Sequence, residues 1–401
     1  MSRLIDTTPA EPHGRVKARL AAAVEAAREE ILDLSHRIHA NPEPAFEEHQ
    51  AARWVADAVA GQGFRVEHPA GRLPTALRAT LPGGQGSDGP RIGILAEYDA
   101  LPGLGHGCGH NAMAGSGVGA AIALASVADE LRGEIVFLGT PAEERGSGKQ
   151  FMVDDGLFED VDAALLFHPS DTNNAACALL ASVDVEVTFT GQQAHAAADP
   201  WRGKNALDAL VLLFNSIALW RQQLRPTARV HGIVLEGGTA ANIIPDRTRA
   251  RFMVRSDDQA DFERMKERFA RMVEAAALAT DCGGEASFTG GSWTMKDNAV
   301  LRGRWLANMT AYGVADQPID YTRLGSSDMG NVSHVLPTIH PMLAICDEGT
   351  PGHSTDFRDA AATPRADEVT LLAATLVAQT AYELFADPEL VAAAWREFRG
   401  G

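Results

Sequence analysis

The residues best suited to chemistry in this 401-residue chain are metal-ligand types among glycines, directly after an apolar run. Cys108 and His110 lie two residues apart in the stretch His-Gly-Cys-Gly-His, which follows the apolar residues 92–96. Thiolate and imidazole both bind transition metals, and glycines leave the backbone free to bend around an ion. A turn between a predicted strand and a predicted helix is also where open α/β sheets place their chemistry. The stretch therefore predicts half of a metal site.

Further candidate ligands follow other predicted strands or lie in a loop downstream. They are the adjacent pair Glu143 and Glu144, then His168, and finally His353. Cys108, His110, one of the two glutamates, His168 and His353 are five candidate ligands. One ion in a closed structural site takes only four. Together with Asp99 and a spare carboxylate, the set suits two ions that share a bridging group and leave coordination positions for water.

Such a site would support hydrolysis of an amide bond. A metal lowers the pKa of a bound water toward about 7. A carboxylate beside that water can take its proton during attack on a carbonyl and pass it to the leaving nitrogen. Two adjacent glutamates cannot face one ion in the same way, so we expect one of Glu143 and Glu144 to be a ligand and the other to be the general base. The residues alone leave the order of the two open.

Each candidate also has a purely structural interpretation when it is taken alone. A cysteine is most often a small buried hydrophobic residue, the Glu143–Glu144 pair could begin a solvated helix, and His168 could be an ordinary core histidine. His353, in a Gly-Ser-Thr loop, is the weakest candidate by itself. The Cys-x-His spacing among glycines nevertheless favours a metal site. The other cysteines, which we assign to packing, are Cys177, Cys282 and Cys346.

The elements that must position these residues alternate between helix and strand patterns. Helical spacing of apolar residues predicts helices over 15–39, 47–62, 117–131 and 366–385. Apolar runs predict strands over 76–81, 92–96, 134–140 and 163–167. This alternation is typical of an α/β domain with a mostly parallel sheet flanked by helices.

The pattern changes between residues 182 and 293. Residues 183–190 alternate with period two, which is typical of a half-exposed strand, and a long helix, more strands and a charged amphipathic helix follow. We interpret this block as an inserted α+β domain. The remainder, 14–181 and 294–398, would form a discontinuous catalytic, metal-binding domain, and two domains also suit the length of the chain.

Composition limits the possible partners and compartments. The formal net charge is −18, whereas binding to nucleic acid or to an anionic membrane needs patches of Lys and Arg. No apolar run approaches the ~18 residues of a membrane span, and the N-terminal sequence lacks the apolar segment of a signal peptide. The few, scattered cysteines are typical of a reducing compartment. We therefore expect a cytoplasmic protein that binds neither nucleic acid nor a membrane.

Several motifs follow one another in the order that a known family shows. They are Glu97-Tyr-Asp-Ala-Leu-Pro, His106-Gly-Cys-Gly-His-Asn111, Thr140-Pro-Ala-Glu-Glu144, His168-Pro169, Gly191-Gln-Gln-Ala-His195-Ala-Ala, Gly237-Gly-Thr-Ala-Ala-Asn242-Ile-Ile-Pro-Asp, Gly325-Ser-Ser-Asp-Met-Gly-Asn331 and Gly352-His353-Ser. Through them the chain resembles the aminoacylase/carboxypeptidase-type family of dinuclear metallopeptidases. It is similar in particular to the amidohydrolase branch, which includes aminobenzoyl-glutamate hydrolases and indoleacetyl-amino-acid hydrolases.

The resemblance implies a catalytic domain that holds two divalent metal ions, with Zn or Mn expected and Co or Ni also possible. The ligands that it implies are Cys108, His110, Glu144, His168 and His353. Glu143 would be the general base, and Asp99 would orient the site. The inserted block would be a lid and dimerisation domain, and its implied substrate-binding residues are His195, Asn242 and, as a weaker candidate, Arg255. In a homodimer, His195 would reach into the partner's site.

The chain also departs from the family pattern at three places. Many members carry His-x-Asp where this chain has Glu97-Tyr-Asp99. Arg145 follows the glutamate pair where a glycine is expected, and we expect its side chain to turn outward. Asn111 replaces an aspartate that is common in the branch, which leaves the hydrogen-bond partner of His110 open.

We therefore expect a metal-dependent amidohydrolase that cleaves an N-acyl or N-aminoacyl amino acid, or a related dipeptide, without a covalent intermediate. One alternative is a non-catalytic binding or assembly protein with the same fold, although such a protein has no need for the full ligand set. The other alternative is an aminopeptidase. It would need an acidic group for the substrate's ammonium, whereas the inserted block offers His195, Asn242 and Arg255.

Overall fold

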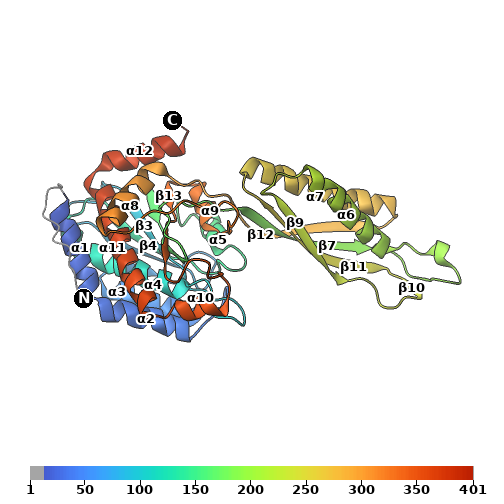
Figure 1. Ribbon diagram of the computed structural model, residues 1–401, viewed down its shortest axis with the longest axis horizontal. Helices are drawn as coiled ribbons and strands as arrows, with labels where there is room; N and C mark the ends of the chain where they lie inside the picture. The colour runs from blue at the N-terminus through green and yellow to red at the C-terminus, as the bar shows by residue number, and fades with distance from the viewer. Residues whose placement is uncertain (1–12, 401) are drawn as a thin grey trace. The chain divides into compact units, whose positions relative to one another are not determined.

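The computed structural model describes residues 13–400, and they form two compact units. The first unit contains the described residues up to 178 together with 295–321 and 331–400. The second unit contains 179–294 and also 322–330, a segment that the sequence analysis assigns to the other domain. Each unit has its own sheet and its own covering helices, so each is described by itself (Figure 1).

The first unit is built on a six-stranded sheet in the order β1-β2-β4-β3-β5-β13. Its strands are β1 (Arg65–Glu67), β2 (Leu77–Pro82), β3 (Arg91–Ala96), β4 (Glu134–Gly139), β5 (Ala163–Leu165) and β13 (Thr338–Ile339). The pairs β3–β4, β3–β5 and β5–β13 are parallel, and only β1 and β2 run antiparallel to their neighbours. A parallel pair, β6 (His168–Ser170) with β14 (Met342–Ala344), continues from β5 and β13. The predicted mostly parallel sheet is therefore confirmed.

Helices cover this sheet. They are α1 (Gly14–Ala26), α2 (Arg28–Ala40), α3 (His49–Gly61), α4 (His110–Ala125), α5 (Gly148–Asp154), α8 (Ala299–Ala311), α10 (Thr355–Ala360), α11 (Pro364–Ala386) and α12 (Pro388–Phe398), with a 3₁₀ turn at Ala128–Glu130. The short α9 (Met329–Ser333) crosses the boundary between the two units. The apolar helix α4 packs on β3 and is itself contacted by α1, α2 and α11 (Figure 1).

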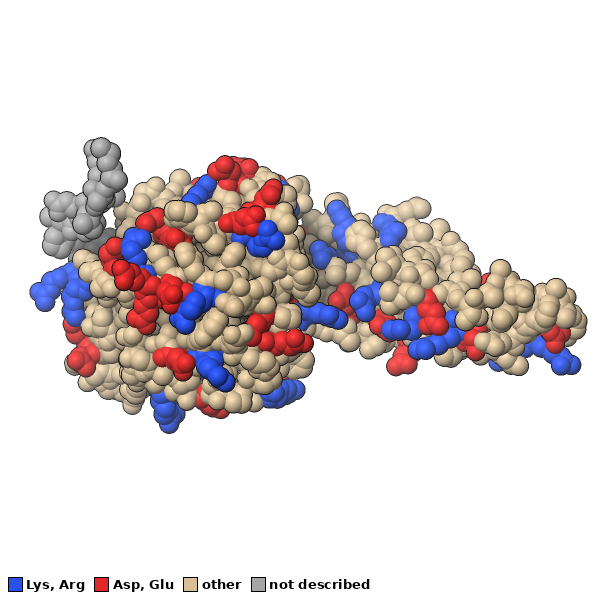
Figure 2. All heavy atoms as spheres, turned by 90° about the horizontal axis from the view of Figure 1, so that it is seen from below, with Lys and Arg blue, Asp and Glu red and all other residues tan. Residues whose placement is uncertain are grey.

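Helix α11 is long and apolar enough to cross a membrane by length and composition alone. However, 78% of its most apolar stretch is buried inside the structure, mainly against α4, α1 and α8. Its apolar side chains therefore contribute to the core of the first unit. On the face shown in Figure 2, acidic and basic side chains are intermixed over this unit, and no large basic area interrupts them.

Two predicted helices have different ends in the structure. The single helix predicted over 15–39 is two helices, because the chain leaves helical geometry at Ala27, where neither glycine nor proline marks the break. The helix predicted to begin at residue 117 begins at His110 instead. Gly109 adopts a left-handed conformation with φ of 79°, which turns the chain directly into the helix. His110 is thereby placed on the rigid first turn of α4.

The second unit is an antiparallel sheet in the order β12-β7-β11-β9, with two helices over one face. Its strands are β7 (Ala181–Thr190), β9 (Arg229–Glu236), β11 (Arg247–Ser256) and β12 (Gly283–Ser292), and a short pair is formed by β8 (Ala194–His195) and β10 (Ile243–Ile244). Its helices are α6 (Ala206–Trp220) and α7 (Gln259–Ala279), with 3₁₀ turns at Pro200–Arg202 and Arg221–Gln223. The predicted α+β insertion is confirmed.

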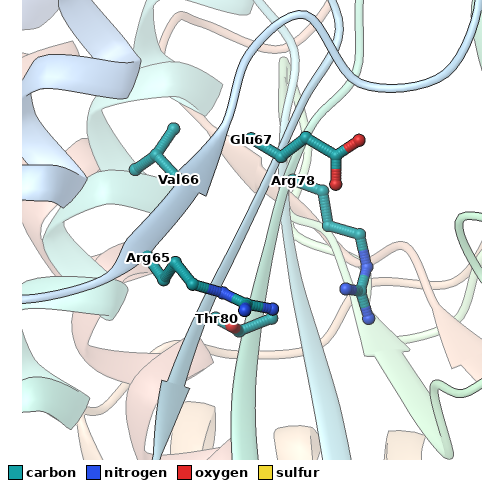
Figure 3. Close-up of a pocket in the computed structure, with 5 residues that line it drawn as sticks. All are labelled: Arg65, Val66, Glu67, Arg78 and Thr80. Carbon is teal, nitrogen blue, oxygen red and sulfur yellow. The ribbon is translucent and has the colours of Figure 1, made fainter.

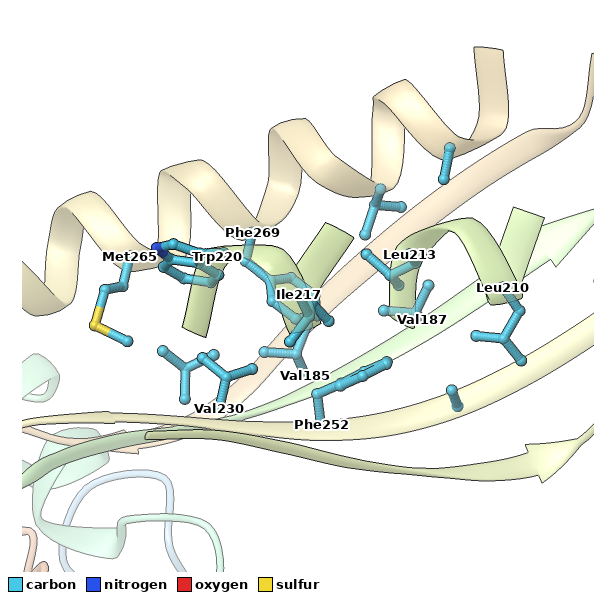
Figure 4. Close-up of a cluster of buried hydrophobic side chains, with 14 of the residues drawn as sticks. Val185, Val187, Leu210, Leu213, Ile217, Trp220, Val230, Phe252, Met265 and Phe269 are labelled. Atoms are coloured by element: carbon cyan, nitrogen blue, oxygen red, sulfur yellow. The ribbon is translucent and has the colours of Figure 1, made fainter. Parts of the chain in front are cut away.

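Alternating residues of β7 and β11 form the core of the second unit against α6 and α7 (Figure 4). Phe252 is 1% exposed, and its ring lies 5.1 Å from the ring of Phe214 and 5.2 Å from that of Phe269. Gly232, its neighbour on β9, leaves room for the ring, since a Cβ there would lie 2.2 Å from the ring. Phe252 is thus the centre of a close-packed cluster.

Replacing Phe252 with alanine should therefore destabilise the second unit by about 3–5 kcal/mol, the cost of a large cavity in a packed core. Urea unfolding of the full chain measures this, with Leu278→Ala as the control because Leu278 is 81% exposed. We expect the control to unfold like the parent. Equal stability of the Phe252→Ala variant would contradict this account of the core.

Candidate metal centre

The candidate ligands meet because three parallel strands end at one edge of the first sheet. Strand β3 is followed by Glu97 and Asp99, β4 leads to the glutamate pair, and β5 leads to His168. Parallel neighbours present their carboxyl ends together, which brings side chains from distant parts of the sequence to one place. His110 joins them from the first residue of α4.

Three groups of metal-ligand atoms lie at this edge, and the atoms within each group are all within 4.8 Å of one another. They are Cys108 with His110 and His168, Cys108 with Glu144 and His353, and Glu97 with His110 and Glu143. Cys108 and His110 each belong to two of the groups. A thiolate placed between two such groups would be able to serve two ions.

The histidines are held so that their Nε2 atoms turn toward the other ligands. Asp99 accepts a hydrogen bond from His110 Nδ1 on its carboxylate at 3.0 Å, and its main-chain oxygen lies at the same distance. The carbonyl of Pro169 accepts one from His168 Nδ1 at 2.6 Å. With Nδ1 acting as donor, Nε2 of a neutral ring keeps a lone pair for a metal. His168 Nε2 lies 3.5 Å from Cys108 Sγ.

Several buried polar atoms at the site have no hydrogen-bond partner among the described residues. They are Glu97 Oε2, His110 Nε2, Glu144 Oε1 and His340 Nε2, of which the first two lie 3.1 Å apart as an ion pair but form no hydrogen bond. A buried polar atom without a partner is costly and usually signals a missing ligand, ion or water. Since these atoms are oxygen and nitrogen ligand types around a shared thiol, the donor set fits divalent metal ions.

The loop of His353 is tied to the Cys108 loop. The amide of His353 donates to the carbonyl of Gly107 at 3.0 Å, and its Nε2 lies 3.4 Å from Glu144 Oε2. His353 adopts a positive φ of 55°, which is strained for a residue with a side chain, and its side chain is 57% exposed. It therefore closes the group around Glu144 from the solvent side.

The electrostatics of the site favour the protonated forms of three candidate ligands. Burial and the neighbouring carboxylate of Glu144 raise the pKa of the Cys108 thiol. Burial, together with the charge of Asp99, raises the pKa of Glu144 to about 7. Burial opposes the charged form of His110, but Asp99 and Glu97 outweigh it and raise its pKa well above the usual value. Since a ligand must be deprotonated, metal binding here releases protons and should tighten as pH rises.

Glu97, the first residue of the Glu-Tyr-Asp motif, is paired with a lysine in the structure. Its Oε1 lies 2.5 Å from Lys149 Nζ, and its Oε2 lies 3.1 Å from His110 Nε2, with all three side chains fully buried. Burial would raise the pKa of Glu97, but Lys149 and His110 lower it to about 2. The low pKa keeps Glu97 ionised at neutral pH, and the sequence analysis did not assign this residue to the site.

Lys149 and His340 are further neighbours of the centre that the sequence analysis missed. His340 is fully buried, its ring lies 5.4 Å from that of His168, and its Nδ1 donates to the carbonyl of Leu166 at 3.0 Å. Burial lowers its pKa to about 4. His340 follows β13 just as His168 follows β5, so its place after a short apolar run was a usable signal. Lys149 carried no such signal, because it lies within α5.

The remaining departures from the family pattern are resolved by contacts. The partner of His110 is Asp99, while Asn111 donates instead to the hydroxyl of Ser35 at 3.0 Å and to the carbonyl of Ala361 at 2.9 Å. Arg145 is exposed, as expected.

Within the second unit, the structure brings His195 and Asn242 together but not Arg255. His195 pairs with Ile243 in the β8–β10 ladder, directly beside Asn242. Its Nδ1 accepts from the amides of Ala197 and Ala198 at 3.2 Å, so its proton is on Nε2 and this exposed ring is a donor. Arg255 lies near the far end of β11, with its Nε 2.9 Å from the sulfur of Met253.

A hollow on the first unit lies away from these residues, on the antiparallel strands β1 and β2 (Figure 3). It is lined by Arg65, Val66, Glu67, Arg78 and Thr80. None of the predicted ligands lines it, so the strand ends remain the candidate centre.

Comparison with known proteins gives the family. The chain is 36% identical to the Xaa-Arg dipeptidase of Mus musculus over 399 residues, covering 96% of this chain and 92% of that protein. The chain belongs to the M20 peptidase family. It is also 30% identical to one of the p-aminobenzoyl-glutamate hydrolase polypeptides of Escherichia coli, with 92% of each chain covered. A family profile described as "Peptidase dimerisation domain" matches residues 178–281.

Solved structures share the M20 fold. A Bacillus subtilis protein described as a dinuclear metal binding peptidase of this family superposes with a TM-score of 0.68 at 19% identity, covering 90% of this chain and 99% of that one. The aminobenzoyl-glutamate utilization protein of Klebsiella pneumoniae gives 0.71 at 20% identity, covering 91% and 98%. As an M20 peptidase, the chain is a metal-dependent hydrolase of amide bonds.

Cys108 belongs to two ligand groups. Its replacement should therefore lower the number of bound metal ions per chain more than replacement of a ligand that belongs to a single group. We expect about two zinc ions per loaded parent chain, about one in His353→Ala, and clearly less than one in Cys108→Ala. Elemental analysis after dialysis measures this, with Cys346→Ala as the control because that cysteine belongs to none of the ligand groups. Two retained ions in Cys108→Ala would contradict the shared-ligand geometry.

Proposed function

We propose that this M20 peptidase hydrolyses dipeptides and related N-acyl amino acids that carry a free carboxylate, with Glu143 as general base. The observation that carries the proposal is the pair of ligand groups that share Cys108, with Glu143 beside them in the third group. The ligands would be Cys108, His110, Glu144, His168 and His353. This assignment also orders the glutamate pair, since Glu144 groups with Cys108 whereas Glu143 does not.

When bound, two divalent ions would supply the Lewis-acid chemistry that lowers the pKa of water toward about 7. Zinc or manganese are the expected ions, and the thiol and imidazoles favour zinc. Glu143 takes a proton from the attacking water and gives it to the leaving nitrogen, which is general acid–base catalysis by one carboxylate. Its side chain is 9% exposed, enough to meet a substrate. Asp99 orients His110 through the hydrogen bond described above.

We infer that the second unit supplies donors for the substrate. His195 presents an Nε2 proton, and Asn242 beside it presents an amide, a combination that suits a carboxylate or an oxyanion. Arg255 is the weaker candidate. It lies near the end of β11, whereas Asn242 lies just before the start of that strand.

The relatives favour a dipeptide with a basic C-terminal residue. The mouse and human proteins that the chain resembles over 96% of its length are both named Xaa-Arg dipeptidase, and they are more similar to it than the bacterial aminobenzoyl-glutamate hydrolase. We therefore place Xaa-Arg and Xaa-Lys dipeptides first. Aminobenzoyl-glutamate and N-acyl amino acids come second.

A substrate panel separates these classes and the two rival functions. We expect cleavage of β-alanyl or α-aminoacyl arginine, a much weaker reaction when the C-terminal carboxylate is amidated, and loss of activity with chelator. An aminopeptidase would instead tolerate the amide and require the free amine. A non-catalytic protein would bind a ligand but cleave none.

Glu143→Gln should lower kcat by about 10²–10⁴-fold, because the amide cannot accept the proton. Metal content should stay at the parent value, since Glu143 is assigned no metal. Glu159→Gln, which changes an exposed carboxylate of the same unit, serves as the control. If the parent protein cleaves the substrate and kcat is unchanged in Glu143→Gln, Glu143 is not the general base.

We also propose a homodimer formed through the second unit. Strand β9 is an edge strand that pairs only with β11 among the described residues, and it exposes Ile233, Val234 and Leu235 at 62%, 50% and 41%. Helix α6 adds Leu219 at 68%. An exposed apolar edge usually marks an interface, and the matched profile is that of a dimerisation domain. A soluble cytoplasmic dimer with four reduced cysteines remains our expectation for the cell.

Ile233→Lys combined with Leu219→Glu should convert the dimer to a monomer in light scattering. Charges introduced at an apolar interface would be buried without partners, which opposes association. Leu278→Glu is the matched control, since Leu278 is 81% exposed on α7, away from β9. A parent protein that is monomeric, or a double variant that stays dimeric, would contradict the assigned surface.

A further inference from the structure

Glu48 is a fully buried carboxylate that the proposed chemistry does not use. It precedes α3, and it accepts three hydrogen bonds from separate segments of the first unit. Its Oε1 accepts from the amides of Phe46 at 2.9 Å and Ala142 at 2.8 Å, and its Oε2 accepts from the hydroxyl of Thr75 at 2.8 Å. These bonds connect the segment before α3 to the loop that follows β4.

The loop that follows β4 carries the glutamate pair. Ala142 has a positive φ of 59°, and Phe46 has one of 68°, both in the region that residues with side chains rarely adopt. Such conformations cost of order 1–3 kcal/mol and persist only where the surroundings enforce them. The two strained amides donate to the same oxygen of Glu48, so this one side chain stabilises both turns.

A second carboxylate, that of Asp99, holds the loop after β4 two residues further along the chain. The amide of Glu144 donates to Asp99 Oδ2 at 2.9 Å. The residue between the two held amides is Glu143. Its backbone is thus fixed on one side by Glu48 through Ala142 and on the other by Asp99 through Glu144.

We propose that Glu48 is a positioning residue for the general base: its Oε1 fixes the backbone of Ala142 and thereby the direction of the Glu143 side chain. This proposal rests on the proposed function, since it takes Glu143 to be the base. In this role the Glu48 side chain must be long enough to place an acceptor oxygen at the Ala142 amide. Its negative charge is not required. Misplacement of a reacting group by about 1 Å can cost 10²-fold in rate.

Two variants separate geometry from charge. Glu48→Gln keeps the length and a carbonyl oxygen that accepts both amides, and its NH₂ donates to the Thr75 hydroxyl. Burial raises the pKa of Glu48 to about 7, so a neutral group suits this position. Glu48→Asp keeps the charge but is shorter by one methylene, about 1.5 Å. Thr75→Val removes only the bond to Oε2 and leaves the Ala142 amide held.

We expect kcat to fall about 10–100-fold in Glu48→Asp and Glu48→Ala, with KM and metal content near the parent values. Glu48→Gln should stay within about fivefold of the parent, because a neutral acceptor still holds the amides, with bonds about half as strong. Thr75→Val should also stay close to the parent. Retained kcat in Glu48→Asp, or a larger loss in Glu48→Gln than in Glu48→Asp, would overturn the proposal.

A readout without substrate keeps this test separate from the proposed function. Hydrogen exchange of the peptide that contains residues 141–147 should speed up clearly more in Glu48→Asp and Glu48→Ala than in Glu48→Gln, whether or not a substrate is known. If this exchange pattern is observed but the parent cleaves no substrate in the panel, the proposed function is wrong. The conclusion that Glu48 fixes the loop after β4 would still be correct. Exchange that is unchanged in Glu48→Asp would overturn the positioning role itself.

Discussion

Asp99 joins the two segments on which the candidate metal centre depends, and it uses a different carboxylate oxygen for each. Oδ1 accepts from His110 Nδ1 at 3.0 Å, and Oδ2 accepts from the Glu144 amide at 2.9 Å. Hydrogen bonds to a carboxylate are roughly twice as strong as neutral ones, and at 1% exposure water does not compete for them. The direction of one candidate ligand, His110, and the placement of the glutamate pair therefore depend on a single side chain that follows β3.

The second constraint on the centre is charge. Glu97, Asp99, Glu143 and Glu144 are gathered at one edge of a sheet, and Lys149 is a buried cation among them. The Glu97–Lys149 pair neutralises one of these charges, and His110, whose pKa Asp99 and Glu97 raise, is a second cation beside them. Divalent ions would balance the others, and a ligand that binds only the folded chain also stabilises it.

The sequence predicted the parts of the site that depend on the order of elements. Apolar runs followed by candidate ligands predicted the strand ends, and parallel pairing of β3, β4 and β5 brings the residues that follow them to one edge of the sheet. It could not predict side chains that arrive from elsewhere. Lys149 lies on a helix of ordinary composition, and Glu48 precedes another, so only the folded chain shows that they contact these strand ends.

Two of the predicted helix boundaries were wrong for a related reason. The break at Ala27 has no glycine or proline, and the early start of α4 depends on the left-handed conformation of Gly109. The pattern was clearer in the second unit, where strict alternation along β7 predicted its buried face. Segment 322–330 joins that unit through tertiary packing, which no local pattern records.

X-ray absorption at the zinc edge of the loaded protein tests the central claim, a thiolate shared by two ions, most directly. The account predicts a sulfur scatterer at about 2.3 Å for the average zinc, with nitrogen and oxygen at about 2.0–2.2 Å, and a second zinc at about 3.5–4 Å. The sulfur and the zinc–zinc signals should both vanish in Cys108→Ala. A parent spectrum with nitrogen and oxygen neighbours only, and no metal–metal signal, would contradict the shared ligand.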